Sequence, residues 1–353
     1  MPQMKIAKIH FYTKYDSLGA SSRVRTMQYL ENLSSEFSVS ISPLISNKAL
    51  LLKYQNSKIY RLYYFLGMLK RSVIAMIRSR FRLDDLTIIE KELFPWTPFF
   101  IERLFLPGKF IIDADDAIYH NYDDVPWLKD KHPRLAAEAS KVHVGNDYLA
   151  SFYRQHNLNI EIIRTSINVK NYKTRVALKA LPVIVWIGSP STSKYLRLAM
   201  DALNELSLST DFLVRLIGFS DSLLESRFKF KYEIIPWSES TELSELANCD
   251  IGIMPIPNDL FERGKCGYKL VQYLASGLLP VASNVGINAE IIKGAQNGIL
   301  VCDNDWLRAL DSAFKNISSH DSKIGYRFVL ENFDVSKTYI RIQRSFKAAI
   351  SND

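Results

Sequence analysis

The chain has 353 residues, of which 47% are hydrophobic and 23% are charged, a composition typical of a globular protein with about two domains at roughly 150 residues each. Three cysteines without a C-x-x-C pair argue against a disulfide framework and a cysteine-based zinc site, and they indicate a reducing compartment. The net charge of +8 is concentrated between residues 37 and 83, which include nine basic residues and no Asp or Glu.

Apolar residues alternate at the start of the chain and predict a strand over residues 5–12. A loop of small residues follows it. After the loop, apolar residues recur at helical spacing over residues 24–33, with Ser21 or Ser22 as the expected N-cap. Further strands of the N-terminal half are predicted over residues 86–90, 110–113, 141–145 and 160–164.

The chain turns polar and basic over residues 168–182, where we place a linker. Beyond it, strands are predicted over residues 182–188, 213–218, 232–235, 249–254, 279–283 and 298–301, and a final helix over residues 335–350. Strands that alternate with helices predict an α/β fold with parallel sheets and helices on both faces. In such sheets ligands bind at the carboxyl ends of strands, and two such domains in tandem predict a cleft between them.

A glycine-containing segment at residues 264–277 is the most informative part of the sequence. Gly264 and Gly267 permit close approach of the backbone to a ligand, and a helix is predicted to begin near Tyr268. Lys265 and Lys269 add positive charge beside the N-terminus of that helix, a combination that suits a diphosphate. The same spacing also fits a loop that caps an ordinary helix, so the residues alone leave both interpretations open.

The segment GKCGYKLVQYLASG at residues 264–277, followed by PVASNVG at residues 280–286, resembles the nucleotide-sugar-binding segment of glycosyltransferase family four. The resemblance is strongest to the bacterial surface-polysaccharide branch of that family. Three further segments resemble the family in the expected order, namely residues 185–192, 110–119 and 162–168.

This resemblance implies the GT-B fold, in which two Rossmann-like domains face each other across a cleft. Residues 1–170 would form the acceptor-binding domain and residues 180–333 the donor-binding domain. Residues 334–353 would form a C-terminal helix that packs back on the N-terminal domain.

The resemblance also implies an activity. We expect retaining transfer of a sugar from a nucleotide-diphosphate sugar to a glycan or an undecaprenyl-linked acceptor, in bacterial polysaccharide or lipopolysaccharide synthesis. No metal and no cofactor are expected, because the helix N-terminus and the lysines offset the diphosphate charge. Two alternatives stay open: another GT-B nucleotide-sugar enzyme such as an epimerase, and a non-catalytic GT-B subunit that binds a partner or a membrane.

Many members of the family carry two glutamates eight positions apart, where this chain has Gly264 and Gln272. Gln272 can bond one ribose hydroxyl but lacks the charge-assisted grip of a carboxylate. Glu262 is a candidate substitute for the first glutamate. Trp237 is a candidate to border the nucleotide base, and packing in the core is the alternative for it. Lys265 and Lys269 are the expected catalytic cations, and the expected donor-binding residues are Gly188, Ser189, Ser191, Thr192, Lys194, Trp237, Glu262, Gly264, Cys266, Gly267, Tyr268 and Gln272.

In the acceptor domain, the D-x-D spacing at residues 113–116 resembles the metal-binding motif of an unrelated glycosyltransferase fold, whereas the GT-B family uses no such metal. Asp115 and Asp116 stand where many relatives have His-Asp, so we expect a carboxylate that accepts the acceptor's proton or supports positive charge on the sugar. Capping of a helix is the equal alternative. The expected acceptor-binding residues are Gly19, Ser22, Arg23, Glu90, Glu92 and His120.

The basic segment mixes cations with tyrosines and aliphatic residues over residues 48–82. This pattern predicts peripheral contact with an anionic membrane, and a buried helix with a solvated basic face is the alternative. Nucleic-acid binding has no recognised motif to support it. Residues 1–15 lack a signal-peptide pattern and no run of 18 apolar residues occurs, so we expect a cytoplasmic protein, peripheral on the inner face of the cytoplasmic membrane.

Overall fold

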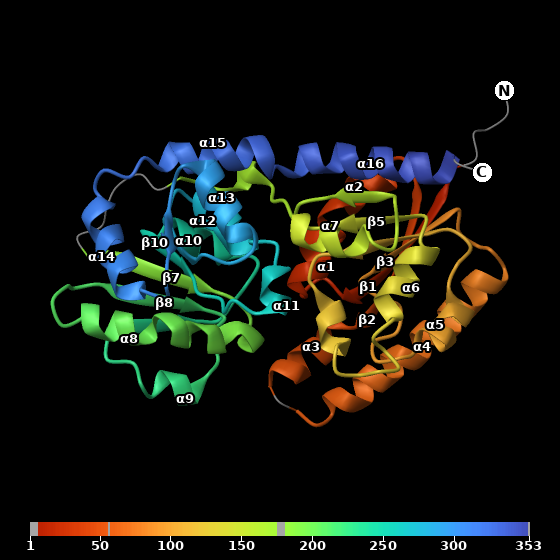
Figure 1. Cartoon of the computed structure of the whole chain (residues 1–353), viewed down its shortest axis with the longest axis horizontal. Coiled ribbons are helices and arrows are strands. Elements are labelled where there is room, and N and C mark those ends of the chain that lie inside the picture. Colours follow the sequence, from red (N-terminus) through yellow and green to blue (C-terminus); the bar gives the residue numbers. More distant parts are fainter. Residues whose placement is uncertain (1–5, 56, 175–180, 352–353) are drawn as a thin grey trace. The chain divides into compact units, whose positions relative to one another are not determined.

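The computed structural model describes residues 6–55, 57–174 and 181–351. The chain divides into two compact units (Figure 1). Unit 1 comprises Met1–Thr165, Gly264–Cys266 and Thr338–Asp353, and unit 2 comprises Ser166–Arg263 and Gly267–Lys337. Gly264–Cys266 therefore group with unit 1, although the sequence analysis assigned them to one continuous donor domain. The start of the first predicted strand and residues 175–180 of the predicted linker lie outside the described residues.

Unit 1 contains a six-stranded sheet of order β2-β1-β3-β4-β5-β6, and all neighbouring strands in it are parallel. Its strands are β1 (Lys8–Tyr15), β2 (Ser38–Ile45), β3 (Leu86–Glu90), β4 (Phe110–Ala114), β5 (Lys141–Val144) and β6 (Ile160–Ile162). The register pairs Glu90 with Asp113, and Asp113 with His143. The carboxyl ends of β3, β4 and β5 are therefore aligned at one edge of the sheet.

Short helices and one long helix, α4, connect these strands. They are α1 (Ala20–Arg25), η1 (Met27–Tyr29), α2 (Leu30–Ser34), α3 (Asn47–Tyr54), α4 (Tyr60–Arg80), α5 (Phe99–Glu102), η2 (Arg103–Phe105), η3 (Ile118–Tyr122), α6 (Lys131–Glu138) and α7 (Asp147–Tyr153). The final helix, α16 (Val335–Ser351), was predicted over residues 335–350, and from Thr338 onward it belongs to unit 1.

Unit 2 contains a second six-stranded parallel sheet of order β12-β11-β10-β7-β8-β9. Its strands are β7 (Val183–Ile187), β8 (Leu213–Ile217), β9 (Tyr232–Ile235), β10 (Ile251–Met254), β11 (Leu279–Ser283) and β12 (Ile299–Val301). Its helices are η4 (Val169–Asn171), η5 (Pro190–Leu196), α8 (Arg197–Leu206), α9 (Ser222–Glu225), α10 (Glu242–Ala247), α11 (Leu260–Arg263), α12 (Tyr268–Ala275), α13 (Ile287–Ala295), α14 (Trp306–Asn316) and α15 (Ser322–Asn332).

Strand β7 shows why both faces of the unit 2 sheet need helices. Successive side chains of a strand point to opposite faces. Val183, Val185 and Ile187 join a cluster with residues of α12, α13 and α15. Ile184 and Trp186 join a second cluster with residues of α8 and α14. All five side chains are buried, so a continuous apolar run produces a strand that is covered on both sides.

Two features of the N-terminal half differ from the prediction. The strand β2 was not predicted, because Pro43 interrupts its alternation; proline is tolerated there since β2 lies at the sheet edge. The expected N-cap was also wrong. Gly19 occupies the cap position of α1, and Ser21 and Ser22 lie within the helix with their hydroxyl groups bonded to Glu90.

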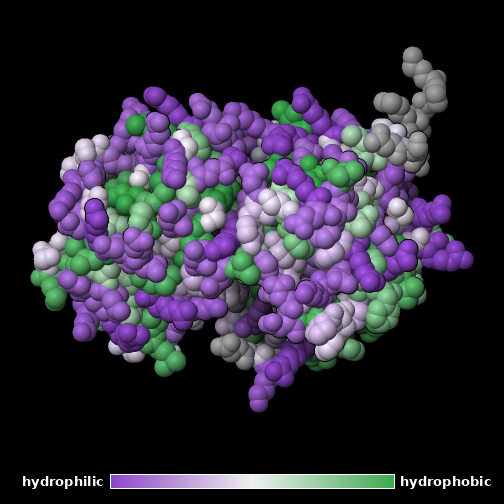
Figure 2. All heavy atoms as spheres, viewed as in Figure 1, coloured by the Kyte–Doolittle hydropathy of each residue, from purple (hydrophilic) through white to green (hydrophobic). Residues whose placement is uncertain are grey.

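Helix α4 exposes most of its apolar side chains, so the alternative of a buried helix was wrong. Phe65 is 63% exposed and Leu69 is 53% exposed, whereas only Arg71 and Ala75 are buried among the described residues of the helix. Hydrophobic atoms gather at the lower right of Figure 2, where Figure 1 places α4. Across the described part of the chain, no helix combines the length and apolar character needed to cross a bilayer.

Not every cation of the basic segment is on the surface. The guanidinium of Arg71 is buried and donates to the carbonyls of Ser42 (2.7 Å) and Thr13, and burial lowers the pKa of Arg71 to about 10. Arg78 pairs with Asp84. The exposed cations of the segment are Lys48, Lys53, Lys58, Arg61, Lys70, Arg80 and Arg82.

Candidate active site

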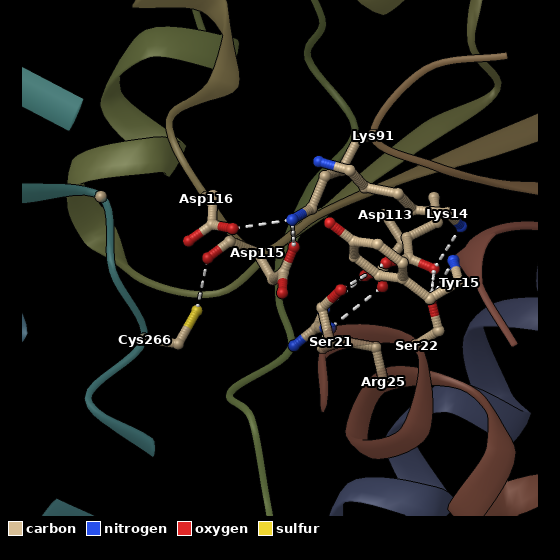
Figure 3. Close-up of polar contacts among 12 residues, drawn as sticks. Lys14, Tyr15, Ser21, Ser22, Arg25, Lys91, Asp113, Asp115, Asp116 and Cys266 are labelled. Carbon is tan, nitrogen blue, oxygen red and sulfur yellow. Dashed lines mark hydrogen bonds and ion pairs between the residues drawn. The ribbon is translucent and has the colours of Figure 1, made fainter. Parts of the chain in front are cut away.

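Charged residues crowd the carboxyl edge of the unit 1 sheet (Figure 3). Glu90 ends β3 and is 2% exposed. Its carboxylate accepts hydrogen bonds from the hydroxyls of Ser21 (2.9 Å) and Ser22 (2.5 Å), and from the backbone N–H of Lys14 (2.9 Å). Glu90 thus fixes the loop between β1 and α1.

Lys91 follows Glu90 and bridges two carboxylates. Its Nζ lies 2.8 Å from Asp115 Oδ1 and 2.7 Å from Asp116 Oδ2. Its backbone has φ +66°, a left-handed conformation that is uncommon for lysine and is found at functional sites. Burial opposes the charge of Lys91, yet Asp115 and Asp116 together raise the pKa of Lys91. The ammonium group is therefore a fixed positive charge.

The two aspartates differ in their ionisation. Burial raises the pKa of Asp115 to about 6, although Lys91 opposes the shift. For Asp116 burial acts in the same direction, but Lys91 and Lys265 outweigh it and lower the pKa. The Asp116 side chain is 26% exposed, whereas that of Asp115 is 10% exposed. Asp116 is thus the ionised carboxylate that a substrate can reach.

A second ion pair lies beneath these groups. Arg25 Nε donates to Asp113 Oδ2 (3.0 Å), and a second nitrogen of the same guanidinium bonds Asp113 Oδ1. Arg25 also donates to the carbonyl of Ile163 (2.5 Å). Burial alone would lower the pKa of Arg25, but Asp113 raises it. Asp113, the first aspartate of the D-x-D spacing, is therefore already paired with an arginine.

The segment Gly264–Cys266 lies against this edge. The side chain of Asn146, which also caps α7, donates to the carbonyls of Gly264 (2.9 Å) and Lys265 (3.1 Å). Cys266 Sγ donates to the carbonyl of Asp115 (2.8 Å), and a Cβ at Gly145 would collide with that sulfur. Burial raises the pKa of Cys266 to about 12, so its thiol stays protonated and serves as a hydrogen-bond donor.

The remaining acceptor-side predictions fall in different surroundings. Glu92 accepts two hydrogen bonds from Tyr122 Oη (2.8 and 2.9 Å) and pairs with Lys131 (2.6 Å). His120 bonds Asp123 and Tyr148 on the surface side of η3. The predicted Gly19, Ser22 and Arg23 are all buried at the start of α1, where Gly19 is the N-cap.

In unit 2, helix α12 begins at Tyr268, as predicted. Gly267 caps it with φ +66°, and a Cβ there would also meet Ile291 at 2.5 Å. Lys269 is the second residue of the helix, and its ammonium group lies 4.5 Å from the centre of the buried Trp186 ring. This cation–π contact holds Lys269 beside the N-terminal turn of α12.

The loop after β7 contains the other small donor-side residues. A Cβ at Gly188 would approach Trp186 at 2.5 Å and Thr192 Oγ1 at 2.8 Å. The hydroxyls of Ser189 and Ser191 lie 2.9 Å apart, and Thr192 donates to the Ser189 carbonyl (3.0 Å). Lys194 is exposed and lies over the ring of Tyr195.

Three of the predicted donor-binding residues form hydrogen bonds with other residues of unit 2. The amide of Gln272 is buried and donates to Tyr172 Oη (3.2 Å) and Glu242 (3.3 Å). Trp237 Nε1 donates to the same Glu242 (2.6 Å). Glu262, the candidate substitute for the missing glutamate, is buried and accepts a hydrogen bond from Tyr195 Oη.

Sequence reasoning missed Lys91, Asn146 and the ion pair of Arg25 with Asp113. Each acts through partners that are distant in the chain, and a single sequence carries no signal for those partners. Position at a strand end was the one available clue, since Lys91 follows β3 and Asn146 follows β5. Among the described residues, no group of three or more His, Cys, Asp or Glu side chains is arranged to hold a metal ion.

Residues 181–320 match the family model described as Glycosyl transferases group 1. The match supports a group 1 glycosyltransferase. It covers the segment that contains β7, the Gly188 loop and α12. Among curated proteins, none matches this sequence.

Solved structures of similar fold were also found. A sucrose-phosphate synthase of Thermosynechococcus elongatus is 14% identical with a TM-score of 0.75, covering 98% of this chain and 100% of that chain. The HepE protein of Anabaena, in complex with UDP-glucose, is 13% identical with a TM-score of 0.74, covering 97% and 100%. WaaG, a glycosyltransferase involved in lipopolysaccharide biosynthesis, is 12% identical with a TM-score of 0.67, covering 98% and 100%. The predicted GT-B fold of two Rossmann-like domains is confirmed.

Proposed function

We propose that this glycosyltransferase transfers a sugar, with retention and without a metal, from a nucleoside diphosphate sugar to a glycan or lipid-linked acceptor of bacterial polysaccharide or lipopolysaccharide synthesis. The observation that carries the proposal is Lys269 beside the N-terminal turn of α12, within the group 1 domain. Two proteins of similar fold support the proposed donor and pathway. The HepE protein was solved with UDP-glucose, and WaaG is involved in lipopolysaccharide biosynthesis.

The donor chemistry falls to unit 2. When the bond between the anomeric carbon and the phosphate oxygen breaks, negative charge develops on the leaving diphosphate. The N-terminal turn of α12 and the ammonium of Lys269 are fixed positive charges that stabilise this group more strongly in the transition state than in the ground state. The acceptor hydroxyl attacks the same face of the sugar, and its proton passes to the leaving phosphate.

The acceptor chemistry falls to unit 1. Asp116 is the exposed, ionised carboxylate of the strand edge, and Lys91 holds it in place. An ionised carboxylate can accept a hydrogen bond from the acceptor hydroxyl and stabilise positive charge on the sugar ring. Asp115 helps to position these groups. Its side chain also pairs with Lys91, and its backbone carbonyl accepts a hydrogen bond from the Cys266 thiol. Lys265 adds charge beside Asp116.

Helix α4 favours a lipid-linked acceptor. Its exposed face combines apolar side chains such as Leu66 and Phe65 with exposed cations such as Lys70. That combination suits the surface of an anionic bilayer, where each cation contributes about 1 kcal/mol. We therefore expect residues 48–82 to dock peripherally on an anionic membrane, without the buried Arg71.

The test is release of nucleoside diphosphate from UDP-, GDP- and dTDP-sugars in EDTA, with a bacterial lipid extract as acceptor. Product that appears only with acceptor and carries label from the donor sugar supports the proposal. A converted donor sugar without transfer would instead indicate an epimerase.

A non-catalytic subunit is the alternative that one observation favours. Gly264 and Gln272 stand where many relatives have glutamates, and the Gln272 amide is already bonded to Tyr172 and Glu242. Nucleotide binding without any release or transfer would favour that alternative.

A further inference from the structure

A pocket of about 330 Å³ opens in unit 1 beside the charged strand edge. This volume is in the range of small-molecule pockets. The pocket brings together the end of β1, the helices α3 and α4, the loop after β3 and the helix η3. Its main polar and aromatic lining residues are Lys14, Lys53, Arg61, Tyr64, Trp96 and Tyr122.

The pocket carries an excess of positive charge. Lys14, Lys53 and Arg61 line it, and Glu92 is the one acid among its described lining residues. The charge of Glu92 is already offset by Lys131, whose Nζ lies 2.6 Å from its carboxylate. Three cations therefore face the pocket without an equal negative charge in its lining, which favours an anionic ligand.

Trp96 provides an apolar face at the same pocket. Its side chain is 61% exposed, and its backbone has φ +61°, a strained conformation for a bulky residue. The conformation is held in place because the Trp96 N–H donates to Tyr122 Oη (3.2 Å) and the two rings pack edge to face. Tyr122 is itself fixed by Glu92. A rigid, exposed indole ring beside cations is suited to stacking against a sugar ring.

Lys14 connects this pocket with the candidate catalytic carboxylate. Burial and then the positive charge of Lys91 lower the pKa of Lys14, whereas Asp116 and Glu90 oppose the shift. Lys14 therefore belongs electrostatically both to the pocket and to the group of Lys91 and Asp116. A ligand that contacts Lys14 from the pocket is therefore within electrostatic range of Asp116.

We propose that this pocket binds the acceptor, and that the acceptor sugar stacked on Trp96 carries a negatively charged group, phosphate or carboxylate, which Lys53 and Arg61 bind. The inference rests on the proposed glycosyltransferase function and adds to it the chemical class of the acceptor. Trp96 selects the sugar ring, and the two exposed cations select the charge.

The test measures binding of glucose 6-phosphate, glucuronate, glucose and inorganic phosphate to the full chain by titration calorimetry at low salt. Glucose 6-phosphate or glucuronate should bind about tenfold more tightly than glucose, and which of the two binds more tightly identifies the charged group. The double variant Lys53→Ala/Arg61→Ala should remove this preference. Lys70→Ala/Arg80→Ala, which removes two exposed cations of α4 outside the pocket, should retain it.

Trp96→Ala should weaken all three sugars and leave inorganic phosphate unchanged, and Trp96→Phe should restore most of the sugar affinity. Equal binding of glucose and the charged sugars would overturn the inference. So would an equal loss in the control pair, or sugar binding that ignores Trp96. A nucleoside diphosphate is titrated into the same preparations: if it binds while the charged sugars do not, the inference alone fails, and if no nucleotide binds, the proposed function fails.

Discussion

The two sheets end in edges of opposite character. In unit 1, Asp113, Asp115 and Asp116 are each matched by a cation, Arg25 or Lys91, within a few ångströms. In unit 2, the loop after β7 consists of small and hydroxyl-bearing residues, and the ammonium of Lys269 lies over an aromatic ring. The comparison suggests different uses of charge. In unit 1 the charges pair with one another, whereas in unit 2 the lysine packs over an aromatic ring beside the N-terminal turn of α12.

The largest expected effect comes from breaking the unit 1 network. Lys91→Met leaves Asp115 and Asp116 buried or half-buried without their shared cation, which should lower the free energy of unfolding by about 3–5 kcal/mol. Urea unfolding at pH 7 measures the loss. The double variant Lys91→Met/Asp115→Asn should recover part of it, because one carboxylate is then neutral. A loss below about 1 kcal/mol would show that the bridge does not hold the edge together.

Acid should affect unit 1 through its buried histidines. Burial lowers the pKa of His143 to about 4, whereas an unperturbed histidine titrates near 6.5. Between these values the unfolded chain binds a proton that the folded chain does not, so stability present above pH 6.5 is lost as the pH falls to 4. The loss from His143 can reach about 3 kcal/mol.

The measurement compares wild type with His143→Gln, which keeps a donor for the Ser345 hydroxyl that His143 bonds at 2.7 Å. Asp113, Glu161, Arg25 and Lys141 also face this ring and are the same in both proteins. Wild type should therefore lose more stability than the variant between pH 7 and 4. Parallel stability curves would contradict the assignment.

The donor side is tested by Lys269→Ala. This change should lower the rate of nucleoside diphosphate release about 100-fold, the typical cost of one lost charge-stabilising group in a transition state, while stability changes little because Lys269 is half-buried. Lys293→Ala, an exposed lysine of α13, is the matched control and should keep full activity. A fully active Lys269→Ala variant would remove the lysine from the mechanism.

The smallest effect concerns the membrane face. Replacing Leu66 and Leu69 of α4 with Glu should weaken binding to anionic vesicles about tenfold, since two apolar contacts are lost and two negative charges are added. Flotation with phosphatidylglycerol vesicles measures the binding. Leu208→Glu, an exposed leucine of unit 2 that is 84% exposed, should leave it unchanged, and equal loss in this control would contradict docking through α4.

The sequence allowed most of the fold to be predicted, because strands such as β3, β4 and β7 are short apolar runs that the interior requires. Strand β2 escaped prediction because Pro43 disturbs its pattern. The candidate site was predicted less completely. Lys269 and Asp116, whose predicted roles follow from residue type and position, could be named as candidates from their motifs.

Residues whose roles depend on partners far along the chain could not be named. Lys91 reaches Asp116 across 25 positions and Asn146 reaches Gly264 across 118, so nothing local in the sequence marks them. Glu90 was predicted from its place at a strand end to contact the acceptor, and its hydrogen bonds to Ser21 and Ser22 could not be foreseen for the same reason.

The most direct test of the central claim is thermal shift of the full chain with UDP, GDP, dTDP, ADP and CMP, with magnesium and with EDTA. A ligand that binds the native state raises the unfolding midpoint by mass action. The account predicts that one nucleoside diphosphate raises it equally in magnesium and EDTA, and that Lys269→Ala reduces the rise. Absence of a shift with every nucleotide, or a shift that requires magnesium, would contradict it.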